Sequence, residues 1–189
     1  MNYPTRISKQ IKKTSYGNRG MNLENELNET NNYYLVNDIA VIHKKPTPIT
    51  ITKVDYPSRI EAVIKEAYFK IPSTTDYNGI YKGKYIDFEA KETKNNNFPL
   101  ANIHEHQIKH LEKVKNHGGI SFLIVRFTLK NTTFLLETKY LLDFIEKEKR
   151  KSIPYDYFLK NGFIIKDKFN PRIDYLSIVD EILKRGEIV

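Results

Sequence analysis

Two carboxylates and a lysine stand within one short stretch of the chain, and residues of these types can support metal-assisted cleavage of a phosphodiester. The stretch TTDYNGIYKGKYIDFEAK spans residues 74–91 and contains Asp76, Glu89 and Lys91. Two carboxylates can hold a hard divalent cation, and a nearby lysine can orient or help deprotonate the attacking water and offset charge on the phosphate. The spacing is loose, so an edge hairpin with a solvated charged face is an alternative interpretation.

A hairpin would bring the two carboxylates together. If Lys82-Gly83 form a two-residue turn, counting back along both arms places Asp76 opposite Glu89 and Thr74 opposite Lys91. Opposed residues of two antiparallel strands have Cβ atoms about 4.5–5.5 Å apart, which is close enough to share one cation. A turn at Asn78-Gly79 would give a different register and separate the two carboxylates.

Strand alternation separates polar from apolar side chains in the second arm of this hairpin. One face receives Asp87, Glu89 and Lys91, and the other receives Ile86, Phe88 and Ala90. Opposed carboxylates on the polar face would repel each other, so a shifted pKa, the lysine or a bound cation must relieve the repulsion. The pattern therefore predicts an apolar face for packing and a polar face for chemistry.

Six segments, taken in order, carry a more specific signal than the triplet. They are YGNRGMNLE (16–24), AVIHKKPTPITI (40–51), YPSRIEAVIKEAYF (56–69), the stretch 74–91, FPLANIHEHQ (98–107) and PRIDYL (171–176). Together they resemble the RecU family of Holliday-junction resolvases from Gram-positive bacteria, which belongs to the PD-(D/E)xK nuclease superfamily. The resemblance covers residues 16–127 nearly continuously, fades over 128–170 and returns near the C-terminus.

The resemblance implies an α/β fold of the restriction-endonuclease-like type, with a central mixed sheet flanked by helices and a protruding stalk. It also implies a Mg²⁺ site, which Mn²⁺ should also support, and roles for particular residues. The implied metal ligands are Thr74, Asp76, Glu89 and Gln107, and the implied transition-state stabiliser is Lys91. Thr75 stands where the superfamily name has a proline.

Four of the five histidines lie within residues 104–117, and two of them have the spacing of a zinc pair. His106 and His110 are four residues apart, but Gln107 replaces the glutamate base of an H-E-x-x-H metalloprotease, which excludes that chemistry. Gln107 falls on the inward face of a helix predicted over 103–115. Its amide must find a partner there, either at a metal site or on neighbouring backbone.

Composition favours a polyanionic partner and excludes several other kinds of site. Lys and Arg total 31 against 23 Asp and Glu, giving a formal charge of +8. The absence of cysteine excludes disulfides, thiolate zinc sites and thiol nucleophiles. No apolar run is long enough to span a bilayer, and the first residues lack the apolar core of a signal peptide, so we expect a cytoplasmic protein without membrane contact.

The predicted organisation is a flexible basic arm at 1–20, then one nuclease domain over 21–189 with a stalk inserted at about 50–72. Helices are predicted at 21–35, 103–115, 139–149 and 175–184, and strands at 39–44, 49–55, 120–127 and 132–137. Residues 58–69 have apolar residues at helical spacing, but the resemblance places this segment in the stalk and replaces the helical interpretation.

Basic and aromatic residues near the stalk are candidates for contacts with DNA. They are Arg19, Lys44, Lys45, Arg59, Lys65 and Phe69. Lysine and arginine bind phosphates, while aromatic faces stack on bases that have lost their neighbours. Tyr68 and Phe69 are adjacent in the chain, so we expect one to pack in a core and Phe69 to stack.

These observations predict a homodimeric, metal-dependent endonuclease that cuts four-way DNA junctions by shape. Two symmetric nicks require two active sites related by a two-fold axis. The resemblance implies roles in recombination, DNA repair and chromosome segregation beside recombinase and branch-migration proteins. The alternatives are a restriction-type endonuclease of the same fold, and a non-catalytic protein that binds junctions or anneals strands through its basic surface.

Overall fold

The computed structural model describes residues 22–58, 60–69 and 74–186. The predicted basic arm at 1–20 lies outside the described residues, as do the candidate DNA contacts Arg19 and Arg59.

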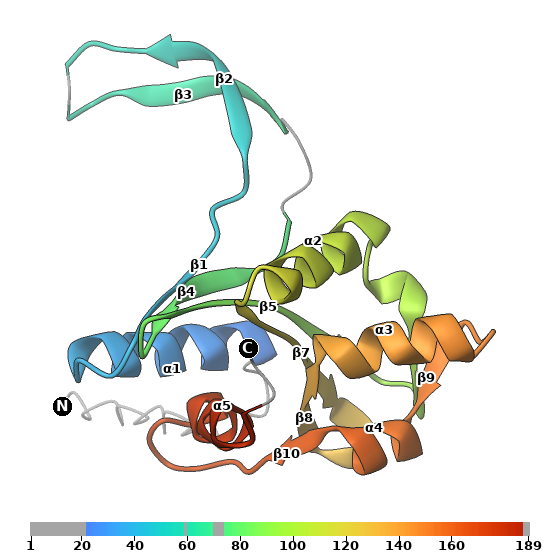
Figure 1. Ribbon diagram of the computed structural model, residues 1–189. Helices are drawn as coiled ribbons and strands as arrows, with labels where there is room; N and C mark the ends of the chain where they lie inside the picture. Colours follow the sequence, from blue (N-terminus) through green and yellow to red (C-terminus); the bar gives the residue numbers. More distant parts are fainter. Residues whose placement is uncertain (1–21, 59, 70–73, 187–189) are drawn as a thin grey trace, which may run out of the picture.

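A mixed sheet forms the centre of the described protein (Figure 1). Its six strands are ordered β1-β4-β5-β7-β8-β10, and only the central pair β5–β7 is parallel. Their bounds are β1 Val41–Lys44, β4 Tyr77–Tyr81, β5 Lys84–Thr93, β7 Ile120–Phe127, β8 Thr132–Glu137 and β10 Phe163–Ile165. β7 is buried along nearly its whole length, as expected for a central strand with both faces covered.

Helices cover both faces of this sheet (Figure 1). α1 (Leu23–Val36) and α5 (Tyr175–Lys184) lie on one face, where Phe88 and Phe122 stack in the core. α2 (Glu105–Asn116) and α3 (Thr138–Lys147) lie on the other face, and α4 (Tyr155–Asn161) contributes to the same second core. A central mixed sheet flanked by helices confirms the predicted fold class.

Two further strands form a ribbon that stands away from the sheet (Figure 1). β2 (Ile49–Asp55) and β3 (Val63–Phe69) pair with each other in antiparallel fashion, and all their residues are exposed. The helical spacing in 58–69 therefore gave a wrong indication, and the stalk expected from the resemblance is present. The apolar residues of this segment do not pack into a core, so their spacing carries no information about a buried face.

Most predicted elements appear within a few residues of their expected bounds, and the exceptions have local causes. α2 begins at Glu105 and not at the predicted residue 103, because Leu100–Asn102 forms a short 3₁₀ helix and His104 is the N-cap. α1 begins two residues later than the predicted residue 21 and ends one residue later than the predicted residue 35. Four short elements were not predicted: β6 (Asn97–Pro99), β9 (Ser152–Pro154), α4 and β10.

Candidate active site

The β4–β5 hairpin has the predicted register. Lys82 and Gly83 both have positive φ, 48° and 74°, as a two-residue type I′ turn requires. The ladder runs from Tyr81 opposite Lys84 to Tyr77 opposite Phe88. Asp76 directly precedes this ladder and Glu89 directly follows it, so the hairpin brings the two carboxylates to the same end.

The competing turn at Asn78-Gly79 does not form, because Gly79 lies inside β4 against the neighbouring strand β1. A Cβ atom at Gly79 would lie 2.0 Å from the carbonyl oxygen of Val41. This glycine is therefore required for close strand packing and not for a turn.

Glu89 is fully buried, and only one of its two carboxylate oxygens has a hydrogen-bond partner among the described residues. Its Oε1 accepts a hydrogen bond from Gln107 Nε2 at 2.8 Å and forms an ion pair with Lys91 Nζ. Its Oε2 is enclosed, and no side chain or backbone group in the described part of the chain donates to it. A buried carboxylate oxygen in this state is unfavourable unless a cation or a proton completes it.

Asp76 and Lys91 complete the acidic cluster. Asp76 Oδ2 accepts a hydrogen bond from the backbone N–H of Ala90 at 3.2 Å and lies 3.8 Å from Lys91 Nζ. Lys91 therefore contacts both carboxylates, as its predicted position on the same face as Glu89 indicated. The cluster borders a cavity of about 190 Å³ that also reaches Leu23 and Glu92.

Burial and, to a smaller extent, the negative charge of Asp76 together raise the pKa of Glu89 to about 7, while Lys91 opposes the shift. Desolvation is the largest cause because the side chain is enclosed beneath α2. Glu89 is therefore partly protonated near neutral pH in the absence of a cation.

These residues fit a divalent cation. Carboxylate oxygens are the donors that Mg²⁺ prefers, and the enclosed Oε2 of Glu89 has a free lone pair for one. Across residues 22–58, 60–69 and 74–186 no group of three or more His, Cys, Asp or Glu residues gathers to hold a metal. A cation bound here would complete its shell with hydroxyl, amide or water oxygens, as Mg²⁺ commonly does.

Gln107 contacts both the acidic cluster and the backbone, which were the two alternatives left open by its spacing. Its Nε2 donates to Glu89, and its Oε1 accepts from the backbone N–H of His104 at 2.9 Å. Gln107 thus closes the first turn of α2 and orients Glu89 at the same time. Its role as a metal ligand stays a prediction.

A second buried carboxylate, Asp87, was not identified as a site residue from the sequence. It is fully buried and accepts hydrogen bonds from Lys45 Nζ at 2.7 Å and from the Tyr85 hydroxyl at 2.9 Å. His110 Nε2 lies 3.1 Å away, and the Thr75 hydroxyl donates to its other oxygen. Strand alternation had placed Asp87 on the same face of β5 as Glu89. A carboxylate that a helix covers needs hydrogen-bond donors and cations around it, because burying an unpaired charge is unfavourable.

The candidate DNA contacts have different surroundings. Lys44 forms an ion pair with Glu24, and Lys65 lies 3.0 Å from Asp55 on the exposed ribbon. Tyr68 and Phe69 are 66% and 83% exposed, so the expectation that one of the two packs in a core is wrong. Within residues 22–58, 60–69 and 74–186, no element covers either face of the ribbon.

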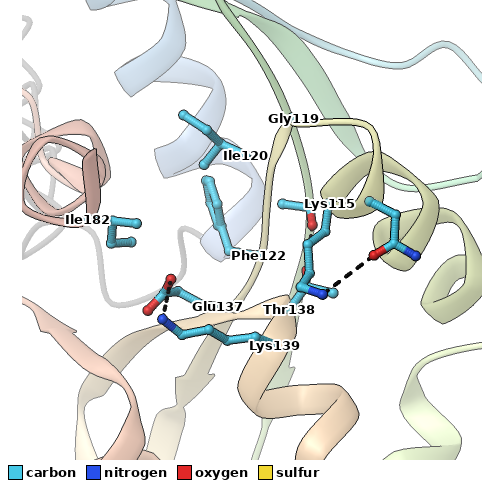
Figure 2. Close-up of a pocket in the computed structure, with 10 residues that line it drawn as sticks. Lys115, Gly119, Ile120, Phe122, Glu137, Thr138, Lys139 and Ile182 are labelled. Carbon is cyan, nitrogen blue, oxygen red and sulfur yellow. Dashed lines mark hydrogen bonds and ion pairs between the residues drawn. The ribbon is translucent and has the colours of Figure 1, made fainter. Parts of the chain in front are cut away.

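A separate cavity of about 290 Å³ lies between the C-terminal end of α2, the start of β7 and the N-terminus of α3 (Figure 2). Lys139 and Glu137 form an ion pair of 3.3 Å on its wall. Its lining contains none of the predicted site residues. The cavity is lined by Lys115, Asn116, Gly119, Ile120, Ser121, Phe122, Glu137, Thr138, Lys139 and Ile182.

An acidic pair beside a lysine, on a hairpin of two interior strands in a helix-covered mixed sheet, is the arrangement that the sequence predicted for a phosphodiester-cleaving protein. The family model described as "RecU: Recombination protein U" matches residues 18–181. The chain belongs to this family.

Two relatives and one solved structure show how far the similarity extends. The Holliday junction resolvase RecU of Bacillus cytotoxicus is 57% identical over 177 residues, covering 92% of this chain and 88% of the relative. That of Bacillus cereus strain AH820 is 56% identical over 176 residues, covering 91% and 88%. Hjc, a Holliday junction resolvase from Archaeoglobus fulgidus, is 10% identical with a TM-score of 0.41, over 69% of this chain and 87% of that one.

The helices of the described part of the chain are short. No helix there is both long and apolar enough to cross a bilayer.

Proposed function

We propose that the protein is an endonuclease that resolves four-way DNA junctions in recombination and DNA repair, with Mg²⁺ or Mn²⁺ as its cation. The observation that supports this most directly is the enclosed, unpartnered Oε2 of Glu89 beside Asp76 and Lys91. The relatives named as Holliday junction resolvases, at 56–57% identity over most of their length, support the substrate.

In this proposal Asp76 and Glu89 hold the cation, with Thr74 and Gln107 as further ligands. When bound, Mg²⁺ supplies positive charge at the phosphate and lowers the pKa of the attacking water. Gln107 fixes the rotamer of Glu89 through its 2.8 Å hydrogen bond. Lys91 offsets the charge of both carboxylates in the resting site and is positioned to stabilise the charge that develops on the phosphate.

Selectivity for a junction is attributed to the ribbon and to the basic surface. A net charge of +8 attracts DNA of any sequence and shape, so it does not by itself distinguish a junction from a duplex. The exposed ring of Phe69 at the base of the ribbon is available to stack on a base that is unpaired at the crossover. Lys44, Lys65, Arg19 and Arg59 are proposed phosphate contacts.

A homodimer is the assembly proposed for the reaction, because resolution needs two nicks on opposed strands. A mixed dimer containing one wild-type and one Asp76→Asn protomer, purified with two different tags, tests this. It should nick one strand and leave the junction unresolved. Full resolution at the wild-type rate by the mixed dimer would contradict the proposal.

A cytoplasmic location and association with recombinase and branch-migration proteins belong to the same proposal.

The experiment that tests the function compares a mobile four-way junction with linear duplex of the same sequence, with and without Mg²⁺. Paired nicks in the junction alone, and only with the cation, are expected. A restriction-type endonuclease of the same fold would cut both substrates. A non-catalytic junction-binding or strand-annealing protein would shift the junction in a gel and cut neither substrate.

A further inference from the structure

Lys45 lies where the outgoing chain leaves the sheet for the ribbon, directly after β1. Its ammonium group donates to Asp87 Oδ2 at 2.7 Å, Thr75 Oγ1 at 2.6 Å and Thr74 Oγ1 at 3.0 Å. Its backbone N–H donates to the carbonyl of Asp76 at 2.8 Å. One residue of the outgoing chain therefore binds all three residues with which the returning chain enters the hairpin.

The three side-chain contacts use the full donor capacity of this ammonium group, which has three N–H bonds. The Lys45 side chain is also only 15% exposed, whereas that of Lys44 is 43% exposed. A phosphate could reach Lys45 only by displacing contacts to a fully buried aspartate. The surroundings of Lys45 are those of an internal anchor.

Asp87 extends this anchor to α2. The same Oδ2 that binds Lys45 also lies 3.1 Å from His110 Nε2, one helical turn after Gln107. Gln107 in turn binds Glu89. A single buried carboxylate thus connects the lysine that fixes Thr74 and Asp76 with the helix that presents Gln107 to the other half of the site.

We infer that Lys45 is a positioning residue that sets the catalytic hairpin against the foot of the ribbon, and that Asp87 is its buried counterion. The inference rests on the proposed function, since it assigns Thr74 and Asp76 to the cutting site. It also gives the ribbon a physical connection to that site, because β2 follows Lys45 along the chain and β3 leads into the residues that Lys45 binds. Lys45 accordingly does not serve as a phosphate contact.

Four variants distinguish two roles of Lys45, positioning the hairpin and merely neutralising the buried charge of Asp87. Lys45→Met removes the anchor and leaves Asp87 as a buried anion without its cation, which destabilises the protein. Lys45→Met combined with Asp87→Asn removes both charges and should recover most of the lost stability. Lys45→Arg keeps the cation. Lys160→Met, on the exposed surface of α4, removes the same charge as a matched control.

The measurements are thermal unfolding, junction affinity without divalent cation, and the single-turnover cleavage rate at saturating protein. Lys45→Met and the double variant should both cut roughly 10- to 100-fold more slowly than the wild type, the usual effect of losing a partner that orients a metal ligand. Their junction affinity should stay within about twofold, because the lost charge does not face phosphate. Lys45→Arg should recover part of the rate, and Lys160→Met should behave as the wild type.

A readout independent of cleavage is amide hydrogen exchange at Ala90 in the free protein. This N–H donates to Asp76 Oδ2, so it should exchange faster in Lys45→Met and in the double variant if Asp76 is displaced. If the wild type does not cut junctions, the proposed function is rejected. The exchange rate at Ala90 would still test whether Lys45 positions Asp76, because this measurement does not depend on cleavage.

Two results would overturn the inference. If Lys45→Met loses junction affinity and keeps the saturated rate, Lys45 is a phosphate contact. If the double variant recovers the cleavage rate together with the stability, Lys45 serves only to neutralise Asp87.

Discussion

At the scale of single residues, Glu89 occupies a position that opposes its own ionisation. The side chain is fully buried, faces the charge of Asp76, and leaves Oε2 without a hydrogen-bond donor among the described residues. Lys91 relieves only part of this cost. Local arrangements that reduce stability are expected at functional sites, where a ligand supplies the missing interaction.

Glu89→Gln should stabilise the cation-free protein at pH 8 and have little effect below pH 4.5. The folded-state pKa of Glu89, about 7, lies above the usual value of 4.5, so the stability it contributes is present below pH 4.5 and is lost as the pH rises through 7. Glutamine does not ionise and avoids this loss, which amounts to about 3 kcal/mol at 1.36 kcal/mol per pKa unit. Urea denaturation at both pH values, with a chelator present, measures the difference.

Added Mg²⁺ provides the control for that experiment. It should stabilise the wild-type protein at pH 8 more than the variant, because the variant lacks one carboxylate ligand. A variant that gains the same stability at both pH values would show that Glu89 ionises like an ordinary surface carboxyl group.

Lys91→Ala should reduce kcat by about 100-fold, the typical effect of removing one donor that stabilises transition-state charge. Junction affinity should change little, since the contacts of Lys91 in the free protein are to the carboxylates of Asp76 and Glu89. The measurement is single-turnover cleavage over a range of Mg²⁺ and Mn²⁺ concentrations. Normal turnover at high metal concentration would mean that Lys91 only tunes occupancy of the site.

At the scale of elements, turn chemistry made the β4–β5 hairpin predictable. The two-residue turn fixes the register locally, and alternation then sorts the side chains of β5 onto two faces. The strands 49–55, 120–127 and 132–137 and the helix 175–184 were predicted with their observed bounds, since each forms a continuous apolar or periodic run.

Other features depend on contacts between distant parts of the chain and could not be predicted from local pattern. Asp87 and Lys45 are 42 residues apart, and nothing near either residue indicates the other. The same applies to Glu26, a buried carboxylate of α1 that forms ion pairs with Arg126 and Arg172. In the second ribbon strand, Val63–Phe69, the apolar spacing indicated a helix although every residue is exposed, and only the resemblance assigned this segment to a stalk.

The ribbon offers a matched pair of neighbouring aromatic residues. Phe69→Ala should weaken binding to a four-way junction by roughly 1–3 kcal/mol, the value of one stacked base, and should leave linear duplex binding nearly unchanged. Tyr68 is the control, because adjacent strand residues point to opposite faces. Both side chains are largely exposed, so neither variant should unfold. Equal losses on both DNA substrates would make Phe69 a general DNA contact.

At the scale of the whole molecule, the proposed function assigns cutting and recognition to two separate parts of the chain. The sheet and its two helical layers hold the acidic cluster, while the ribbon projects from the same end of β1 and β4 (Figure 1). β2 continues from β1, and β3 leads into the β4–β5 hairpin that carries Asp76 and Glu89. Binding of a junction by the ribbon would therefore act on the part of the chain that positions the carboxylates.

The most direct test of the account measures junction binding and junction cleavage together for Asp76→Asn. Asp156→Asn, which removes a carboxylate from the exposed surface of α4, is the matched control. The account predicts that Asp76→Asn binds the four-way junction at least as well as the wild type, because a negative charge near phosphate is lost, and that it no longer cuts in Mg²⁺. Asp156→Asn should bind and cut normally. Full cleavage by Asp76→Asn would contradict the assignment of this hairpin as the cutting site.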